Sequence, residues 1–489
     1  MTTSMMSREP VFDENAISRE ITYQKEGSKV IDWASPNGEI YRLEILPTVY
    51  PPREDTDLLA KTIKSLGPGR GRSCLEIGCG SGVLSAFSAR MGWRVSACDI
   101  NPYAVATARN LASQLGLNIS VHEGGPGPEE EQSFSQWSNN QNYDLIFWNL
   151  PYLKYDKLSE TLGPMEEAAL LDTDGVGLFQ RALYSIEKNS LIKNNGLCLF
   201  LVGDQVEFNE LQKQSAKYNF AARQIDSLTF DNGETIQLIA TWKPFVNAVH
   251  EHIEKIGSTS DELLKRNSPV GSSISANFQT KGHGRKGREW KNTQRSFASS
   301  WVICDTIAEE ILLDQIICGL AVKNSILCLK PNRIDNLFIK WPNDVLLKEG
   351  NGFGKLSGLL IESATIGENH TVILGVGVNL SGTNTNEDFT MSFLDNLEQE
   401  TDFSELKNLI CVFLAGYFED VPGLPAFKRA TVMDIINQEV QKTFNSAKQV
   451  SLEDNLISKI TLTDLGYLEI TTSEGRILCD DGDDLIWEF

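Results

Sequence analysis

The sequence predicts an α/β fold built on an open, doubly wound sheet, followed by a second unit of mixed helices and strands. The chain has 489 residues, too many for one hydrophobic core, so about two to four domains are expected. An apolar strand runs into a glycine-rich turn at Ser73–Gly82 and then into a helix pattern, as in doubly wound sheets. The last residues, Ile457–Phe489, show short alternating strands separated by turns.

Composition excludes several classes of protein. There are 66 Asp and Glu against 44 Lys and Arg, giving a net charge of −22. Such a surface repels nucleic-acid phosphates, so DNA is not expected as a partner, whereas RNA bound by a local basic patch stays open. No apolar run reaches the roughly 18 residues of a membrane span, so no membrane partner is expected. Nine cysteines without paired spacing, and no signal sequence, predict a cytoplasmic protein with reduced thiols.

The N-terminal elements precede the glycine turn. Residues up to about 17 are expected to be disordered, and Ile21–Leu46 alternates around the turn signal Pro36-Asn37-Gly38, which predicts a β-hairpin. A helix is expected from Thr56 to Ser65.

The glycine turn predicts a nucleotide-type site. Gly78, Gly80 and Gly82 permit a tight turn and a close ligand, and the helix Val83–Met91 offers free N–H groups. The next strand ends at Asp99, where doubly wound folds place a carboxylate for ribose hydroxyls. The spacing is not that of dinucleotide folds, and it resembles the turn of S-adenosylmethionine-dependent methyltransferases. A different nucleotide-type ligand is the alternative. The resemblance implies S-adenosylmethionine contacts from Glu76, Gly78, Gly80, Gly82, Asp99 and Asn149.

A second signal stands at the end of the predicted strand Tyr143–Trp148, after a polar loop expected at the surface (residues 124–142). Asn149-Leu150-Pro151-Tyr152 lies where open sheets bind ligands. An Asn oxygen and a neighbouring carbonyl can accept hydrogen bonds from a planar –NH2 group, and an aromatic ring can stack on it. The alternative is a strand-end turn with a core tyrosine.

Residues Val49–Val202 resemble the release-factor glutamine methyltransferases. The resemblance rests on Tyr50–Thr56, on the tetrapeptide at Asn149 and on residues 166–182; Leu150 stands where that family has Pro. It implies that Asn149 is catalytic, that Asn149, Pro151 and Tyr152 hold the methyl acceptor, and that the acceptor is a protein glutamine, for example in a release factor. Asn-Leu-Pro-Tyr also occurs in ribosomal-RNA adenine dimethyltransferases, so RNA or DNA adenine stays open, as does a non-catalytic S-adenosylmethionine-binding module.

A linker is predicted at Lys243-Pro244-Phe245, after a strand–helix–strand pattern over residues 197–242. The expected domains are residues 1–48, 49–243, 246–445 and 446–489. The third begins with an expected helix, Val246–Lys255, and then Ser258-Thr259-Ser260 caps another, Asp261–Arg266.

A basic loop at Gly282–Trp290 carries three glycines and three fixed cations. Arg and Lys in such a loop are suited to phosphate oxygens. It lacks the Gly-Lys-Ser/Thr ending of a phosphate-binding loop, and a solvated basic turn is the alternative.

This loop and four other blocks resemble the biotin protein ligases from Glu251 to Leu380. The blocks are Ser258–Ser260 with Gln279, Lys340–Asp344, Lys355–Glu362 and Gly375–Asn379. His283 stands where the family has Arg, and Ser260 where it has Asn. The resemblance implies an α+β catalytic domain followed by a small SH3-like barrel, with biotin, ATP and Mg2+ as ligands and the biotin carboxyl carrier domain of a carboxylase as partner.

The resemblance also assigns roles. Lys355 and Arg285 are the expected catalytic residues, Lys355 binding both the biotin carboxyl group and the α-phosphate. Asp344 is the expected Mg2+ contact. Biotin and ATP contacts are expected from Ser258, Thr259, Ser260, Gln279, Gly282, His283, Gly284, Arg285, Trp341, Asn343, Asp344, Lys355, Gly358 and Gly377.

Purely structural roles stay open for these motifs: helix capping for Ser258, a turn for Pro342–Asp344 and a solvated lysine for Lys355. A lipoate ligase and a DNA-binding repressor are the rival functions. Helices are expected at Glu405–Phe418 and Phe427–Phe444, and a polar surface loop at Asn384–Glu400.

Overall fold

A computed structural model shows two compact units. One comprises Met1–Leu211, Arg223–Trp242 and Val421–Pro425, and the other comprises Gln212–Ala222, Lys243–Asp420 and Ala426–Phe489. The structure describes residues 27–46, 48–126, 137–151, 177–231, 233, 235–304, 310–350, 352–366, 369–383, 390–397 and 399–489. The expected disordered lead, Tyr152 and most of the block at residues 166–182 lie outside these ranges.

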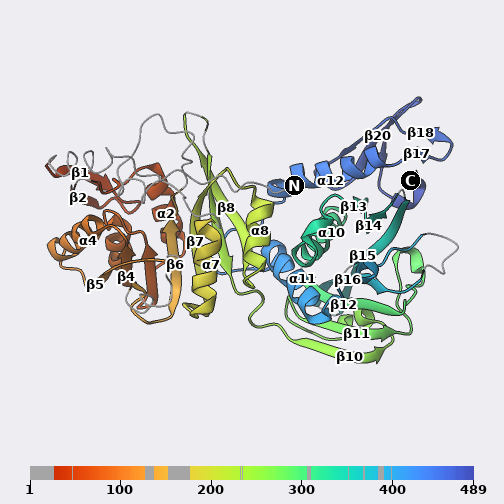
Figure 1. Cartoon of the computed structure of the whole chain (residues 1–489), viewed down its shortest axis with the longest axis horizontal. Coiled ribbons are helices and arrows are strands. Elements are labelled where there is room, and N and C mark those ends of the chain that lie inside the picture. Colours follow the sequence, from red (N-terminus) through yellow and green to blue (C-terminus); the bar gives the residue numbers. More distant parts are fainter. Residues whose placement is uncertain are drawn as a thin grey trace, which may run out of the picture. The chain divides into compact units, whose positions relative to one another are not determined.

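The first unit is built on a seven-stranded sheet of order β5-β4-β3-β6-β7-β9-β8 (Figure 1). The strands β3 to β7 run parallel, and β9 pairs antiparallel with β7. The chain order reverses between β3 and β6, which makes this the switch point where ligands bind. The elements up to Trp242 are β1 (Lys29–Ala34), β2 (Ile40–Ile45), α2 (Glu54–Ser65), β3 (Ser73–Ile77), α3 (Val83–Arg90), β4 (Arg94–Asp99), α4 (Pro102–Gln114), β5 (Ile119–Glu123), β6 (Tyr143–Asn149), α7 (Leu178–Lys188), β7 (Ile192–Gly203), α8 (Phe208–Ala216), β8 (Ala221–Thr229) and β9 (Thr235–Trp242).

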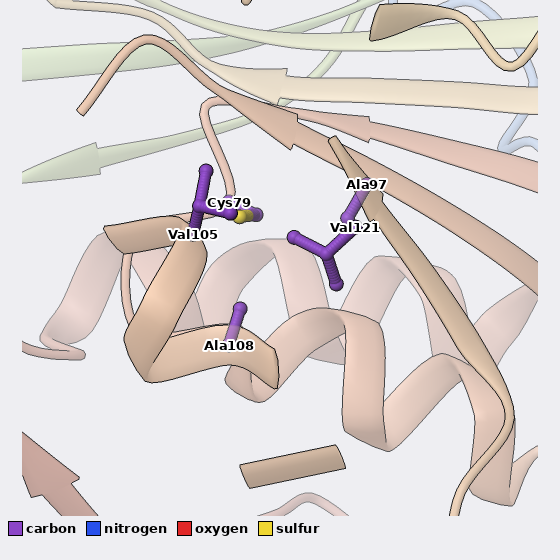
Figure 2. Packing of buried hydrophobic residues seen from close by; sticks show 5 residues of the cluster. All are labelled: Cys79, Ala97, Val105, Ala108 and Val121. Atoms are coloured by element: carbon purple, nitrogen blue, oxygen red, sulfur yellow. The ribbon is translucent and has the colours of Figure 1, made fainter. Parts of the chain in front are cut away.

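Small buried side chains lie beneath the glycine turn. Figure 2 shows Cys79 of the turn packed with residues of α4, β4 and β5. A Cβ at Gly82 would lie 2.6 Å from Cβ of Ala108, so glycine is required for α3 to approach α4. The predicted hairpin is confirmed within the described residues: β1 and β2 pair antiparallel, and Trp33 Nε1 donates to Asp57 Oδ1 of α2 at 2.8 Å.

The second unit is built on a seven-stranded sheet of order β10-β11-β12-β16-β15-β14-β13, with α10 and α11 packed together beside it (Figure 1). The long central strands β15 and β16 pair antiparallel. The elements of the sheet and its helices are β10 (His250–Ile256), α9 (Thr259–Leu264), β11 (Ser273–Gln279), η2 (Arg285–Gly287), β12 (Arg295–Cys304), α10 (Ile311–Leu329), η3 (Pro331–Arg333), β13 (Leu337–Lys340), β14 (Asp344–Glu349), β15 (Gly352–Ile366), β16 (Asn369–Ser381), η4 (Leu394–Leu397), α11 (Phe403–Phe418) and α12 (Ala430–Ser446).

The C-terminal residues form the expected short strands. They make two three-stranded sheets, of order β18-β17-β22 and β19-β20-β21; closure into an SH3-like barrel stays a prediction. The strands are β17 (Gln449–Leu452), β18 (Asn455–Leu456), β19 (Lys459–Leu462), β20 (Leu468–Thr472), β21 (Gly475–Cys479) and β22 (Leu485–Glu488), with η5 (Gly482–Asp484) before the last.

Three local predictions are wrong. The segment expected as helix Val246–Lys255 contains strand β10, because its backbone pairs in parallel with β11. The tract expected as a surface loop before Glu400 includes the buried residues Met391 to Leu394, whose backbone bonds to Lys355 of β15. In the loop expected at residues 124–142, Trp137 is buried. Apolar side chains inside polar tracts explain both loop errors.

Helix α10 is a core helix of the second unit. Its 19 residues are long and apolar enough, by length and composition alone, to cross a membrane. Because 83% of this stretch is buried inside the unit, its apolar character is explained by packing. The expectation that no apolar run reaches this length is therefore corrected. All nine cysteines are free thiols.

Candidate active sites

The glycine turn of the first unit has the backbone that the sequence predicts. Gly78, Gly80 and Gly82 have φ angles of 65°, 50° and 75°, in the left-handed region that favours glycine. A Cβ at Gly78 would lie 2.7 Å from Nε1 of Trp148. Other residues at these positions would therefore strain or block the turn at the switch point.

Two carboxyl groups lie beside this turn in different surroundings. Asp99 is buried, with Oδ2 accepting from the N–H of Gly80 and Oδ1 from that of Asn101, both at 2.9 Å. Glu76 accepts a short hydrogen bond from the Ser85 hydroxyl of α3. Burial raises the pKa of Asp99 and raises that of Glu76 to about 8. Asp99 therefore lies at the turn, while Glu76 faces α3.

Asn149 ends β6 at the same edge of the sheet. Its Nδ2 donates to Oδ2 of Asp55 at 2.8 Å, and the Tyr50 hydroxyl donates to the same oxygen at 3.0 Å. Oδ1 of Asn149 is buried and has no hydrogen-bond partner among the described residues. Leu150 is buried and Pro151 half-buried. The site thus presents a buried acceptor oxygen that a donor group of a ligand could satisfy.

The second unit has a buried network of hydroxyl and amide groups at the start of α9. Gln279 Oε1 accepts from the backbone N–H of Thr259 at 2.8 Å and from its hydroxyl at 3.1 Å. Ser300 Oγ of β12 lies 2.7 Å from Thr259 Oγ1 and 3.0 Å from Ser260 Oγ. Ser258 caps the helix by accepting from the N–H of Asp261 at 3.2 Å. The network is polar but uncharged, which suits a neutral ligand with its own donors and acceptors.

A strip without side chains runs from this network across the sheet. A Cβ at Gly375 would lie 2.9 Å from Ser260 Oγ. Gly377 lies on the same face of β16, since alternate strand residues share a face, and it pairs with Gly358 of β15. The Trp290 ring covers both glycines: added Cβ atoms would lie 2.3 Å from it at Gly377 and 3.0 Å at Gly358.

Lys355 lies at the other end of this strip. Its Nζ is 3.2 Å from the position of a Cβ on Gly358 and 2.7 Å from Oδ1 of Asp344. The β14–β15 register shifts between Val345 and Leu346, beside Lys355, and such bulges redirect side chains. The predicted residues Lys355, Asp344, Gly358 and Gly377 are therefore together.

Two other residues predicted near Lys355 make hydrogen bonds to backbone carbonyls of the protein. Asn343 Nδ2 donates to the carbonyl of Leu359 at 3.0 Å. Trp341 is buried, and its Nε1 donates to the carbonyl of Gly466 at 2.8 Å. Within the described ranges, no group of three or more His, Cys, Asp or Glu side chains could hold a metal. Mg2+ usually binds through one or two carboxylates together with substrate phosphates, and Asp344 fits the role of that single carboxylate.

The basic loop is paired with acidic residues near the C-terminus. Arg285 Nη2 donates to Asp481 Oδ1 at 2.9 Å, and Arg288 Nη2 lies 2.8 Å from Asp483 Oδ1. Lys286, at a φ of 54°, lies 2.6 Å from Asp481 Oδ2. Gly282 is buried, Gly284 half-buried, and Trp290 N–H donates to the Gly282 carbonyl at 2.8 Å.

His283 has an acidic environment of its own. Its Nε2 lies 3.0 Å from Glu362 Oε1 of β15 and 3.9 Å from Asp261 Oδ1 of α9. Burial lowers the pKa of His283, but the hydrogen bond and charge of Glu362, with Asp261, outweigh it, so this pKa lies above its usual value.

Two family models match the chain, one on each half. The model "Biotin/lipoate A/B protein ligase family" matches residues 253–379, and the model "Methyltransferase domain" matches residues 74–168. The chain joins a methyltransferase domain to a biotin/lipoate ligase-family domain. The matched ranges contain Asn149 and Asp99 on one side and Lys355, Arg285 and Gln279 on the other.

Relatives of both kinds cover parts of the chain. A Methanocaldococcus jannaschii protein, whose name assigns it as a protein N5-glutamine methyltransferase, is 28% identical over 37% of this chain and 88% of its own. A biotin–[acetyl-CoA-carboxylase] ligase of Paracoccus denitrificans is 37% identical over 27% of this chain and 54% of its own. A release factor glutamine methyltransferase of Enterococcus faecalis is 26% identical over 32% of this chain and 54% of its own. The chain spans about half the length of the last two.

Sequence reasoning missed several residues of these sites. Asp55 and Tyr50 stand in a recognised motif, but their contact with Asn149 is not readable from it. Ser300 lies in the buried strand β12, and the sequence around it gives no signal of a site. Asp481-Gly482 is a turn signal between the C-terminal strands, and only the charge pattern Asp-Asp-Gly-Asp-Asp around it could have suggested a basic partner.

Proposed function

We propose that the second unit is an ATP-dependent biotin–protein ligase, which forms biotinyl-5′-AMP and transfers biotin to a lysine of a carrier protein. The observation that carries this proposal is the glycine strip. A neutral hydrogen-bonding network at Thr259, Ser260 and Ser300 lies at one end, and Lys355 lies at the other. This arrangement matches a ligand with a polar uncharged ring and an anionic tail.

The same network favours biotin over lipoate. The ureido ring of biotin carries two N–H donors and a carbonyl acceptor, which buried hydroxyl and amide groups can satisfy. The dithiolane ring of lipoate carries no such groups, so it would leave the polar atoms of Thr259, Ser260 and Gln279 without ligand partners. These atoms already bond to one another and to Ser300, so the preference comes from the additional hydrogen bonds that biotin would make, about 0.5–1.5 kcal/mol each.

In the first step, a carboxylate oxygen of biotin attacks the α-phosphorus of ATP, the bond to the β-phosphate oxygen breaks, and pyrophosphate leaves. Lys355 would hold the carboxylate and the α-phosphate together, and Arg285 would stabilise the added negative charge. Asp344 would hold Mg2+, which supplies further positive charge to the phosphates. Trp290 and the basic loop would exclude water from the adenylate.

In the second step, the neutral amine of an acceptor lysine attacks the carbonyl carbon of the adenylate. The bond to the phosphate oxygen breaks, AMP leaves, and one proton passes to solvent as the amide forms. The proposed acceptor is the biotin carboxyl carrier domain of a carboxylase, in agreement with the name of the Paracoccus relative.

Biotin-dependent exchange of pyrophosphate into ATP tests the ligase. Lys355→Ala should lower the exchange rate by about a hundredfold or more, whereas Lys281→Ala, on an exposed lysine, should leave it within twofold. Exchange at the wild-type rate in Lys355→Ala would contradict the role of Lys355. Thermal shift by biotin but not by lipoate would support the choice of vitamin.

For the first unit, we propose an S-adenosylmethionine-dependent N-methyltransferase that acts on a protein glutamine, for example in a release factor. The buried oxygen of Asn149 supports this proposal, because it needs a donor such as the –NH2 of a primary amide. The positive-φ glycines and Asp99 fit S-adenosylmethionine. When bound, this cofactor would supply a methyl group on a positively charged sulfur, a good leaving group.

This reaction requires little general acid–base catalysis from the protein. Asn149 Oδ1 would accept one N–H of the acceptor amide and so turn its nitrogen toward the methyl group, and positioning supplies most of the rate. The acceptor nitrogen would form one bond to the methyl carbon as the methyl–sulfur bond breaks, and it would lose one proton to solvent. The –NH2 of adenine would satisfy the same oxygen, so RNA is the rival acceptor.

Transfer of radiolabelled methyl groups from S-adenosylmethionine into a cell lysate tests this activity. Label in protein supports the glutamine acceptor, and label in RNA replaces it with adenine. Asn149→Ala should remove most of the label. Equal labelling by the variant would show that Asn149 does not hold the acceptor.

A further inference from the structure

The basic loop is neutralised by one short acidic segment, Asp480-Asp481-Gly482-Asp483-Asp484, named here the acidic turn. Asp481 contacts Arg285 at 2.9 Å and Lys286 at 2.6 Å. Asp483 contacts Arg288 at 2.8 Å and Lys286 at 3.4 Å. Each of these three loop cations is therefore paired with a carboxylate of the acidic turn, about 195 residues further along the chain.

The fold fixes the acidic turn in this place. A Cβ at Gly482 would lie 2.3 Å from Cδ of Pro342 and 3.3 Å from the carbonyl of Trp341, so the turn is in close contact with that segment. Asp481 Oδ1 accepts from the N–H of Asp483 at 3.0 Å, and Cys479 Sγ donates to the carbonyl of Asp481 at 3.2 Å. The carboxylates are thus held by backbone contacts, not only by the cations.

The ion pairs occupy the groups that the proposed function assigns to phosphate. A carboxylate and a phosphate oxygen take the same guanidinium and ammonium donors, so Asp481 and the nucleotide cannot both hold Arg285 through the same N–H. The Arg285 side chain is only 17% exposed, which leaves few donors for a second anion.

We propose that the acidic turn is an internal competitor for the phosphates of ATP: Asp481 and Asp483 hold the basic loop in the nucleotide-free enzyme, and phosphates displace them. This inference rests on the proposed ligase function. It makes Asp481 and Asp483 residues that set ATP affinity without contributing to the chemistry. When AMP leaves at the end of the second step, the same carboxylates retake the loop and favour its return to the starting arrangement.

Removal of the two carboxylates should change the affinity for ATP only moderately. Lys286 and Arg288 are more than half exposed, and such pairs are weak because of solvent screening. When only a fraction of the molecules has the basic loop free to bind, the apparent affinity for ATP is the intrinsic affinity multiplied by that fraction. Removal of both carboxylates should therefore lower the KM for ATP about threefold to tenfold.

The test compares two double variants of equal charge change. Asp481→Asn/Asp483→Asn removes the ion pairs but keeps the hydrogen bond from the backbone N–H of position 483, since an Asn Oδ1 at position 481 can still accept it. Asp480→Asn/Asp484→Asn changes the same turn, and within the described residues neither of its positions pairs with the loop. In biotin-dependent pyrophosphate exchange, the first variant should show the lower KM for ATP and an unchanged KM for biotin. The second variant and the conservative Asp481→Glu should match the wild type.

An unchanged or higher KM for ATP in Asp481→Asn/Asp483→Asn would overturn the inference, because the turn would then be neutral or would prepare the loop for binding. Limited trypsin digestion gives a readout that does not need ligase activity. Cleavage after Arg285, Lys286 or Arg288, located by mass spectrometry, should be faster in the first variant than in the second. If the wild type shows no exchange with biotin, the ligase proposal fails, while this digestion still decides whether the turn holds the loop.

Discussion

The side-chain nitrogen of Asn149 donates to Oδ2 of Asp55 at 2.8 Å, although the two residues are 94 positions apart in the chain. An ionised carboxylate can only accept hydrogen bonds, so this contact determines which end of the amide faces Asp55. It leaves Oδ1 of Asn149 as the atom available to a ligand. The Tyr50 hydroxyl, five residues before Asp55, donates to the same carboxylate oxygen and restrains it.

Asp55 should therefore position Asn149 for methyl transfer. We expect Asp55→Ala to lower the rate of methyl transfer about tenfold to a hundredfold, because a freed amide can rotate. The affinity for S-adenosylmethionine, measured by isothermal titration, should stay within twofold. Asp57→Ala, in the same helix turn but bonded to Trp33, is the matched control. Equal losses in both variants would indicate a purely structural effect on α2.

Gly377 should tolerate no side chain. In Gly377→Ala the new Cβ would lie 2.3 Å from the Trp290 ring, which must then move, and such overpacking destabilises by about 1–3 kcal/mol. We expect a lower Tm and an altered tryptophan emission. Gly352→Ala, whose Cβ would meet its nearest atom at 3.9 Å, should show neither change. An unaltered emission spectrum in Gly377→Ala would mean that Trp290 does not lie on the strip.

The pair of His283 and Glu362 should make stability depend on pH. The pKa of His283 is raised in the folded state, so its contribution is full below the unfolded pKa of about 6.5 and is lost as pH rises through the folded pKa. The Tm of His283→Gln should lie below that of the wild type at pH 5.5, and this gap should narrow by pH 8.5. His370→Gln, on β16, controls for the loss of one histidine. A gap that widens with pH would contradict this assignment.

Glu76 should make the stability of the first unit depend on pH. Burial raises its folded pKa to about 8, against about 4.3 when unfolded. Between these values the unfolded chain has lost a proton that the folded protein keeps, so stability falls as pH rises through this window. Glu76→Gln removes this loss and keeps an acceptor for Ser85. The Tm of Glu76→Gln minus the Tm of the wild type should increase from pH 5 to pH 8.

Thermal melting at several pH values checks the Glu76 prediction. The gain at pH 8 should exceed about 1 kcal/mol, or about 2–4 °C in a domain of this size. Glu123→Gln, on an exposed carboxylate, should show no such trend. A constant difference at every pH would show that Glu76 is ionised in both states.

Local patterns predicted much of the fold. The glycine turn before α3, the Ser258 cap of α9 and the loop that leaves β11 follow from short stretches of sequence, and the structure has each of them. Strand β10 could not be predicted in this way. Ile253 and Ile256 are the two strong strand formers among its seven residues, and the parallel backbone pairing with β11 decides its conformation.

The sites were predictable only where one motif holds both partners. Lys355 and Asp344 come from neighbouring strands of a recognisable pattern, and they meet. Ser300 joins the hydroxyl network from a strand 40 residues beyond Ser260. Asp481 reaches Arg285 from 196 residues away. Contacts of this range depend on the packing of whole elements, which periodicity and spacing do not encode.

The paired glycines, Gly358 and Gly377, limit how this face of the sheet can change in evolution. Glycine is the smallest residue, so every substitution at either position adds volume against the Trp290 ring, which lies over both. Under the proposed ligase function, a lineage with a bulkier acid as substrate would gain room by replacing Trp290. Diversity in substrate size should therefore be recorded at position 290 and not at the two glycines.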